Sequence, residues 1–310
     1  MFTNKEYVLA IYREGSFSKA AQRLYISQPS LSASIKRIES KLTMPIFNRA
    51  TTPVSLTPIG EEYVKYALDI EEKERDFERY LSDRTSLLSG NITIGGSSLF
   101  SSFLLPQLIS DFNKKYPKIN FEISEGNTKD LMNKITDGSL DLIIDNAIID
   151  DDSLTSAVYT SEIMLIAVPE NFKINKRLAP WSLSARDIKN EMHYSKKYNV
   201  ALELFKDEPF IFLNPENDTG RRAELLFKKH GISPDVKFYL DQQVTAYNIS
   251  GSGMGISFVS DTLIKYIDAE PSLCYYRLSD EEITRKIYFY RKNQHYFSLA
   301  CQKFIEHSIN

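Results

Sequence analysis

Residues 16–37, SFSKAAQRLYISQPSLSASIKR, place hydroxyl, amide, small and cationic side chains on one face of a predicted helix. Hydroxyls and amides can hydrogen-bond to base edges in a major groove, small residues allow close approach, and Lys and Arg contact phosphates. The candidate DNA-binding residues are Ser16, Ser18, Gln28, Pro29, Ser30, Ser32, Ala33, Lys36 and Arg37, with Arg49 further along the chain. The alternative is an ordinary amphipathic helix whose polar face is only solvated.

Two short helices joined by a tight turn would position these side chains. Ser16 or Ser18 can cap the first helix, expected at about 19–24, and Ser27 can cap the second by accepting a backbone N–H. Pro29 falls in the first turn of the second helix, where its missing N–H costs little. The buried face of the second helix, at spacings of four, three and four, consists of Leu31, Ile35, Ile38 and Leu42.

Hydroxyl side chains further along the chain indicate a second site. Ser97 and Ser98 lie between an expected strand and the next helix, and Thr128 lies at the start of the following helix. Ligands of an open α/β sheet bind at the carboxyl ends of its strands, and helix N termini favour negative charge. We therefore expect a small, anionic ligand there. The alternative is that these three residues are simple helix caps.

The sequence shows no motif for catalysis or for metal binding. His193, His230, His295 and His307 are scattered and lack the spacing of metal ligands. A nucleophile elbow, a P-loop, an HExxH motif and a dinucleotide-binding turn are all missing. We therefore expect a protein that is not an enzyme, with no catalytic residues, metal or cofactor.

Charge is distributed unevenly along the chain. The net charge is −3, but residues 1–58 carry eight basic and three acidic side chains, a balance of +5 that leaves −8 for the rest. A basic end on an acidic body indicates a polyanionic partner for that end. Cys274 and Cys301 form no disulfide framework, which fits a reducing compartment, and they are either inert thiols or a redox pair. Without a signal peptide or an apolar run of about 20 residues, a cytoplasmic protein with no membrane contact is expected.

The elements around these sites separate the chain into parts. We expect a helix over 2–14, a small β-wing over 44–57 and a long, highly charged helix over 58–85, followed by a hinge at 85–90. The long helix carries a heptad-like apolar stripe, Ile59, Tyr63, Tyr66, Ile70, Phe77 and Leu81. Such a stripe needs a partner chain or, alternatively, this chain's own body to cover it. From residue 91, strands alternate with helices, and one strand is expected at 162–169, which predicts α/β structure with a largely parallel sheet.

Several runs of residues together resemble a known family. SFSKAA, LYISQPSLS, IKRIESKL, IFNR and SLTPIG follow one another in register as in the winged helix-turn-helix of LysR-type transcriptional regulators. IGGSSLFSSFLLP, DGSLDLII and GSGMGISFVS resemble the family's effector domain, which is similar to type 2 periplasmic binding proteins. The chain departs from the family at three places. Where it has Ala33 the family often has Arg or Gln, and where it has Thr43 the family has Gly. Its wing tip, Thr51, Thr52 and Pro53, is less basic than the family's.

The resemblance implies an all-α winged helix-turn-helix domain, a linker helix and a two-lobed α/β effector domain. The expected boundaries are 1–58 for the DNA-binding domain, 59–90 for the linker and 91–310 for the effector domain. Lobe I would comprise 91–165 and 268–310, and lobe II 166–267. In the family the positions of Ser97, Ser98 and Thr128 line the effector cleft, and Phe212, Asn214 and Gly253 would face them from the second lobe.

The resemblance also implies the function. We expect a transcription regulator that binds double-stranded promoter DNA as a homodimer or homotetramer and responds to a small effector between the lobes. Two alternatives remain. One is a ligand-binding α/β protein whose N-terminal helices only mediate oligomerisation, and the other is an enzyme of similar two-lobed architecture.

Overall fold

The computed structural model describes residues 2–51, 53–85, 90–267, 272–293 and 296–309. Thr52 of the expected wing tip, His295 and most of the expected hinge at 85–90 lie outside the described residues. The chain divides into two compact units, residues 1–81 and 82–310. Each unit has a hydrophobic core of its own.

The first unit contains short helices, a small wing and most of a long helix. Its elements are α1 (Lys5–Glu14), α2 (Phe17–Arg23), α3 (Gln28–Leu42), β1 (Phe47–Asn48), β2 (Ser55–Leu56) and α4 (Pro58–Thr85), the last of which continues into the second unit. Leu31, Ile35 and Ile38 of α3 are buried as their spacing predicts, in a core that also contains Leu9 of α1 and Ala67 of α4. The expected wing is formed by antiparallel pairing of β1 with β2.

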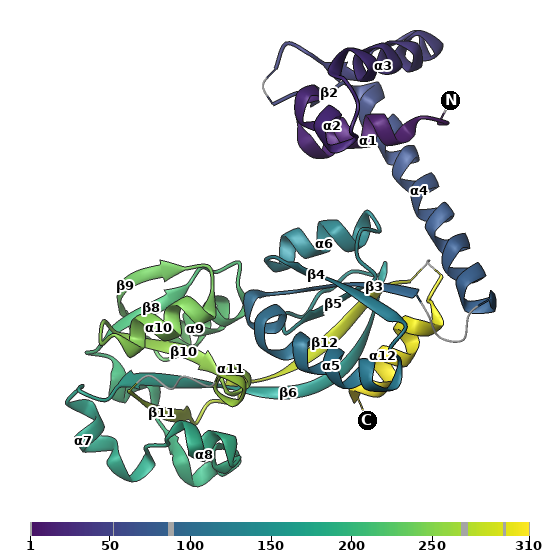
Figure 1. The fold of residues 1–310 in the computed structure, drawn as a ribbon. Helices are drawn as coiled ribbons and strands as arrows, with labels where there is room; N and C mark the ends of the chain where they lie inside the picture. The colour runs from purple at the N-terminus through teal and green to yellow at the C-terminus, as the bar shows by residue number, and fades with distance from the viewer. Residues whose placement is uncertain (1, 52, 86–89, 268–271, 294–295, 310) are drawn as a thin grey trace. The chain divides into compact units, whose positions relative to one another are not determined.

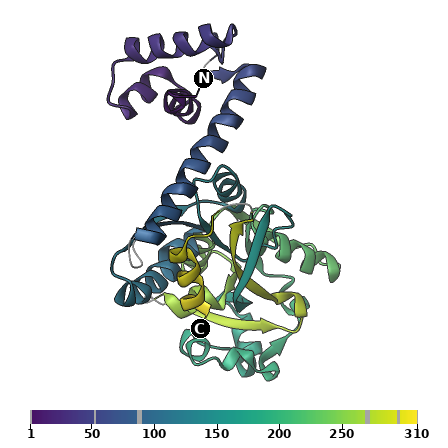
Figure 2. The ribbon, with the colours of Figure 1, turned by 90° about the vertical axis from the view of Figure 1, so that its right-hand side faces the viewer.

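The first lobe of the second unit is a sheet with helices packed on it. The parallel strands β4 (Ile119–Glu125), β3 (Gly90–Gly96) and β5 (Leu142–Asp145) are followed in the sheet by the antiparallel β12 (Thr284–Lys292). Its helices are α5 (Leu105–Lys115), α6 (Thr128–Thr136) and α12 (Leu299–Ile309), and a π-helical turn, Phe100–Leu104, precedes α5. Helices α5 and α12 lie side by side on this sheet (Figures 1 and 2). Phe304 of α12 packs on Phe112 of α5 and Phe289 of β12.

The second lobe repeats the same plan on a second group of strands. Its sheet contains the parallel strands β10 (Ile256–Ser260), β8 (Pro209–Leu213) and β9 (Asp235–Leu240). On the other side of the strand that follows residue 153, which both lobes share, lie β11 (Leu273–Leu278) and its parallel neighbour β7 (Asn199–Val200). Its helices are α7 (Ile174–Leu178), α8 (Ala185–Lys189), α9 (Asp218–Lys229), α10 (Gln243–Gly251) and α11 (Asp261–Tyr266). Short 3-10 turns, Ala179–Trp181, Met192–Tyr194, Lys196–Tyr198, Leu202–Phe205 and Glu281–Ile283, connect these elements.

One long strand, β6 (Leu154–Pro169), runs through both lobes (Figure 1). Its first part pairs with β12, and its part from Met164 onward pairs with β10 and β11. The sequence predicts only its second half, 162–169, because that half is continuously buried, whereas the first half alternates between exposed and half-buried positions. β11 pairs with the second-lobe part of β6, although the sequence places 268–310 in the first lobe, so the chain returns to the first lobe between β11 and β12.

Candidate functional site

The helices α2 and α3 are each capped at the N terminus by a serine side chain. The Ser16 side chain accepts the Lys19 N–H at 3.4 Å, and the Ser27 side chain accepts the Ser30 N–H at 3.3 Å. Ser16 is therefore the cap of α2, which begins at Phe17, earlier than the expected residue 19. Ser18 instead donates to the side-chain oxygen of Gln28 at 3.3 Å, which joins the two helix ends.

The outward face of α3 matches the face predicted to contact DNA. Its exposed residues are Gln28, Pro29, Ser30, Ala33, Lys36 and Arg37, and Ser32 is half-buried. The opposite face is buried in the core of the first unit, so these side chains cannot turn inward. Sequence reasoning missed Tyr25, which is 97% exposed in the turn before α3 and has a positive φ of 55°.

Ion pairs divide the basic side chains of residues 1–58 into two groups. Lys5 pairs with Glu74, Arg13 with Glu71, Arg23 with Glu14 and Arg49 with Glu39, at distances of 2.7, 2.7, 2.8 and 3.0 Å. The other basic residues of this segment, Lys19, Lys36, Arg37 and Lys41, are exposed and make no ion pair within the part of the chain that the structure describes. All four lie on α2 or α3, and two of them, Lys36 and Arg37, belong to the predicted face.

Arg49, predicted to contact phosphate, is engaged inside the first unit. Its guanidinium pairs with Glu39 and lies 5.0 Å from the centre of the Phe17 ring. The second oxygen of Glu39 accepts the backbone N–H of Ile46 at 2.9 Å. These contacts connect α2, α3 and the base of the wing, so Arg49 helps to hold the wing in place.

The apolar stripe of α4 has a buried part and an exposed part. Tyr63 is buried in the core of the first unit, where its ring lies 4.7 Å from the ring of Phe2, so it does not belong to the surface that a partner would cover. Tyr66 and Phe77 are 56% and 60% exposed, and Ile59 and Leu81 are exposed as well.

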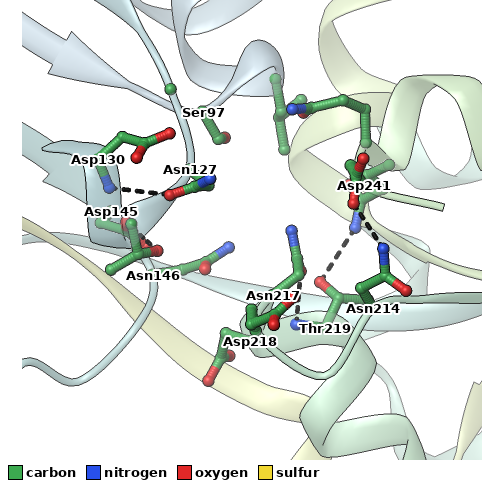
Figure 3. Close-up of a pocket in the computed structure, with 16 residues that line it drawn as sticks. Ser97, Asn127, Asp130, Asp145, Asn146, Asn214, Asn217, Asp218, Thr219 and Asp241 are labelled. Carbon is green, nitrogen blue, oxygen red and sulfur yellow. Dashed lines mark hydrogen bonds between the residues drawn. The ribbon is translucent and has the colours of Figure 1, made fainter. Parts of the chain in front are cut away.

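A cavity of about 300 Å³ lies at the carboxyl ends of strands from both lobes (Figure 3). From the first lobe it is lined by Ser97, Leu99, Gly126, Asn127, Thr128, Asp130, Asp145 and Asn146. From the second lobe it is lined by Asn214, Glu216, Asn217, Asp218, Thr219, Asp241, Gln242 and Gln243. These residues follow β3, β4, β5, β8 and β9, so the cavity occupies the position at which open α/β sheets bind ligands.

The structure brings three of the six predicted effector residues to this cavity, namely Ser97, Thr128 and Asn214. Ser98, Phe212 and Gly253 are not among the lining residues. Ser98 directly follows Ser97 and is the first residue of the helical segment that leads into α5.

Phe212 and Gly253 lie outside the cavity lining for separate reasons. Phe212 belongs to the core, with its ring 5.4 Å from that of Phe227 and 6.2 Å from that of Phe258. Gly253 lies in the turn after α10 with a φ of +83°, and Asn171 would be the first neighbour of a Cβ there.

Hydrogen bonds show that Thr128 is not the cap of its helix. Asn127 caps α6 by accepting the Asp130 N–H at 2.8 Å, whereas the Thr128 hydroxyl donates to Asp145 at 2.8 Å. Burial raises the pKa of the Asp145 carboxyl, although the hydroxyl of Thr128 and the N–H of Ala147 donate to it. The Thr128 hydroxyl therefore belongs to the cavity wall.

The acidic residues of the lining were missed by sequence reasoning. Asp145 ends the run LDLIID, and Asp241 directly follows the run VKFYL, so both stand at strand ends. That position was the signal that could have found them. The lining contains carboxylates but no Lys, Arg or His among the described residues, so its side chains do not favour the anion that the helix N termini predicted.

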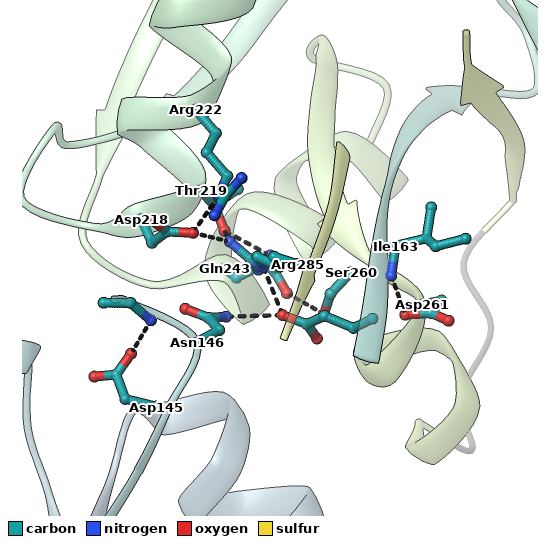
Figure 4. A network of polar contacts seen from close by, with 12 residues as sticks. Asp145, Asn146, Ile163, Asp218, Thr219, Arg222, Gln243, Ser260, Asp261 and Arg285 are labelled. Atoms are coloured by element: carbon teal, nitrogen blue, oxygen red, sulfur yellow. Dashed lines mark hydrogen bonds and ion pairs between the residues drawn. The ribbon is translucent and has the colours of Figure 1, made fainter. Parts of the chain in front are cut away.

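A buried polar network connects the cavity to β6, the strand that runs through both lobes, and to its neighbour β12 (Figure 4). Arg285 of β12 contacts Glu162 of β6 at 2.7 Å and Asp218 at 2.9 Å, and it donates to Thr219 at 3.0 Å. Asn146 of the first lobe donates to Glu162 at 2.8 Å. Burial alone would raise the pKa of Asp218, but the positive charges of Arg285 and Arg222 lower it. The network joins both walls of the cavity to β6 and β12.

Residues 85–309 match the family described as "LysR substrate binding domain", and residues 3–61 match "Bacterial regulatory helix-turn-helix protein, lysR family". The chain belongs to the LysR family. This LysR-type regulator binds promoter DNA and a small effector, as the sequence predicts, and the expected fold class is confirmed. The family consists of transcription regulators, which in general are not enzymes.

Similar proteins extend over nearly the whole chain. "Uncharacterized HTH-type transcriptional regulator YcgK" of Bacillus subtilis (strain 168) is 28% identical over 97% of this chain and 91% of its own length. A full-length OxyR variant from Pseudomonas aeruginosa has a TM-score of 0.73 at 20% identity and covers 99% of this chain and 94% of its own. Full-length CbnR in complex with target DNA has a TM-score of 0.67 at 16% identity and covers 99% of this chain and 98% of its own.

Two further observations bear on partners. None of the helices in the described part of the chain is both long and apolar enough to span a membrane. Within the described residues, His, Cys, Asp and Glu side chains do not gather in groups of three or more that could hold a metal ion.

Proposed function

We propose that the exposed face of α3 lies in the major groove of promoter DNA and that Lys19, Lys36, Arg37 and Lys41 contact phosphates beside it. The observation that carries the proposal is that these exposed cations are left without ion pairs in the described part of the first unit, while Arg49 is held by Glu39. Gln28, Ser30 and Ser32 present the amide and hydroxyl groups for base edges. In this proposal Arg49 positions the wing.

We further propose that the protein acts as a homodimer, or as a homotetramer built from such dimers, in the cytoplasm, where promoter DNA is found. The exposed apolar side chains of α4, among them Tyr66 and Phe77, support a helix-to-helix contact between two copies. Two recognition helices would then meet half-sites about 10 base pairs apart, or a multiple of that distance.

The cavity between the lobes is, in this proposal, the effector site. Ser97 and Thr128 from one lobe and Asn214 from the other would contact the same molecule. A ligand that touches both walls binds one arrangement of the lobes more tightly than another, and this difference in affinity is what shifts a conformational equilibrium.

The proposal is tested by the salt dependence of DNA affinity. Binding of the full chain to a labelled DNA duplex is measured at several salt concentrations by fluorescence anisotropy. Lys36→Ala and Arg37→Ala should each weaken binding on all sequences and reduce the slope of log affinity against log salt by about 1 for each phosphate contact removed.

Lys118→Ala, which removes an exposed lysine of the effector domain, is the matched control and should leave the slope unchanged. Wild-type protein that fails to bind duplex DNA at low salt would contradict the proposal. It would favour the alternative in which the N-terminal helices only mediate oligomerisation.

A further inference from the structure

The charge of the effector cavity indicates the chemical class of its ligand. Its lining carries the carboxylates of Asp130, Asp145, Glu216, Asp218 and Asp241, together with amide and hydroxyl side chains. Among the described residues the lining holds no basic or aromatic side chain, and Leu99 supplies its main apolar contact. The cavity therefore offers many hydrogen-bond acceptors, negative charge and no ring on which a ligand could stack.

Three arginines near the cavity are already engaged. Arg221, Arg222 and Arg285 all contact Asp218, and Arg285 also contacts Glu162. Asp218 is thus neutralised from within the protein.

Three other carboxylates of the lining are not neutralised. Asp130, Glu216 and Asp241 are exposed and make no ion pair within the described ranges of the chain. Their charges remain free to attract a ligand.

The helix N termini at the cavity do not reverse this balance. An N terminus carries partial positive charge that a nearby carboxylate offsets. Asp130 lies in the first turn of α6, Asp218 in the first turn of α9, and Asp241 just before α10. The ends of α6, α9 and α10 are therefore each complemented by an aspartate of this chain, whereas the helical segment that begins after Ser97 has no acidic residue in its first turn.

The arrangement of the carboxylates favours an organic cation over a metal ion. Asp130 lies on the first-lobe wall and Asp241 on the second-lobe wall, facing across the cavity (Figure 3). Among the described residues, no group of three or more His, Cys, Asp or Glu side chains is close enough to hold a metal ion. A volume of about 300 Å³ is at the small end for ligand sites.

We propose that the effector is a small, non-aromatic molecule that carries a protonated amine together with several hydroxyl or amide hydrogen-bond donors. This inference rests on the proposed role of the cavity as the effector site. The amine pairs with the free carboxylates, and the other donors meet the oxygens of Asn214 and Ser97 and the amides beside them.

The test uses sets of probes that share a size and differ in charge. Thermal unfolding of the full chain is followed with glucosamine, glucose and glucuronate, with ethanolamine, ethylene glycol and glycolate, and with putrescine, butanediol and succinate. A ligand that binds only the native state raises the melting temperature. We expect the amine of at least one set to raise it and the neutral and anionic members to do so less or not at all.

Variants then assign the binding to this cavity. The double variant Asp130→Asn/Asp241→Asn should weaken binding of the stabilising amine by about tenfold or more, because two charge-assisted contacts are lost. Asp207→Asn, which removes an exposed carboxylate outside the cavity lining, should leave it unchanged. An equal loss in both variants would show general attraction to an acidic protein and would overturn the inference.

Stabilisation by carboxylates alone, or by none of the amines, would also overturn the inference. DNA binding measured on the same samples separates this result from failure of the proposed function. If DNA binding is intact and no amine raises the melting temperature, only the proposed ligand class is wrong. If an amine raises the melting temperature and the protein does not bind DNA, the proposed DNA-binding function is wrong.

Discussion

His230 is a titratable side chain whose contacts require positive charge. It stands at the C-terminal end of α9, with Nδ1 2.7 Å from Glu203 and Nε2 2.8 Å from Asp280. Both ring nitrogens face carboxylates, so both must donate, and only the protonated ring can do so. The hydrogen bond to Asp280, with that to Glu203, raises the pKa of His230 against the opposing effect of burial.

This contact predicts a pH-dependent contribution to stability. Because the folded-state pKa lies above the unfolded value of about 6.5, the stabilisation is complete below that value and is lost as pH rises through the raised pKa. His230→Gln should lower the free energy of unfolding at pH 6 by at most about 1 kcal/mol, since solvent screens these groups, and by less at pH 9. Urea unfolding at both pH values measures the difference.

The background Glu203→Gln/Asp280→Asn provides the control for His230. Without the two carboxylates the ring has no reason to stay protonated in the folded state, so the loss on His230→Gln should no longer depend on pH. A loss that is equal at pH 6 and pH 9 in the otherwise wild-type chain would contradict the assignment.

At the scale of elements, the end of α3 shows how this chain departs from its family and still makes the turn. Thr43 has a φ of 59°, the left-handed conformation that Gly15 adopts in the same way at the end of α1. A β-branched residue is strained there, by roughly 1–2 kcal/mol. The Thr43 hydroxyl donates to the Leu42 carbonyl at 2.6 Å, which offsets part of that strain.

Thr43→Gly should therefore strengthen α3. We expect the opening free energy of the Leu31 and Ile35 amides in native-state hydrogen exchange to rise by about 0.5–1 kcal/mol. Ser40→Gly is the matched control, because Ser40 lies inside the same helix, where glycine should lower that energy by about 0.5 kcal/mol. Weaker protection in Thr43→Gly than in the wild type would show that Thr43 is not strained.

The exposed part of α4 makes a prediction about assembly. Phe77 is 60% exposed, so replacing it does not disturb the core of one chain. Phe77→Glu should raise the dimer dissociation constant at least about tenfold in sedimentation of the full chain, because it puts charge into an apolar contact. Met254→Glu, at a residue 54% exposed in the effector domain, should leave assembly unchanged. Equal dimerisation of wild type and Phe77→Glu would place the contact elsewhere.

Elements with a one-sided apolar pattern were predictable from sequence, and the details of the cleft were not. The spacing of Leu31, Ile35 and Ile38 fixes the buried face of α3, and Ser27 fixes its start. Phe212 illustrates the limit, because a continuously apolar strand such as β8 does not reveal which of its residues enter the core and which face a cavity. Asp145 illustrates the other limit, since its environment depends on strands that are distant in sequence.

At the scale of the effector domain, Arg285 of β12 connects the ligand cavity with β6, the strand that runs through both lobes. Its side chain is almost completely buried and contacts Glu162 of β6 and Asp218 at the cavity. A buried charge that loses its partner is costly, whereas removal of both partners is much less so. The network therefore makes the arrangement of the two walls depend on β6, which runs through both lobes, and on β12, which pairs with it.

Removal of Arg285 should consequently be among the most damaging single changes in the effector domain. Arg285→Met, which keeps most of the volume, should lower the free energy of unfolding by about 3–5 kcal/mol because Glu162 and Asp218 stay buried with less compensation. The double variant Arg285→Met/Glu162→Met should be clearly more stable than Arg285→Met, since one uncompensated buried charge is gone. Urea unfolding followed by the fluorescence of Trp181 measures both, with Lys286→Met of the same strand, an exposed residue, as the control. A double variant less stable than Arg285→Met would show that the pair acts through packing and not through charge.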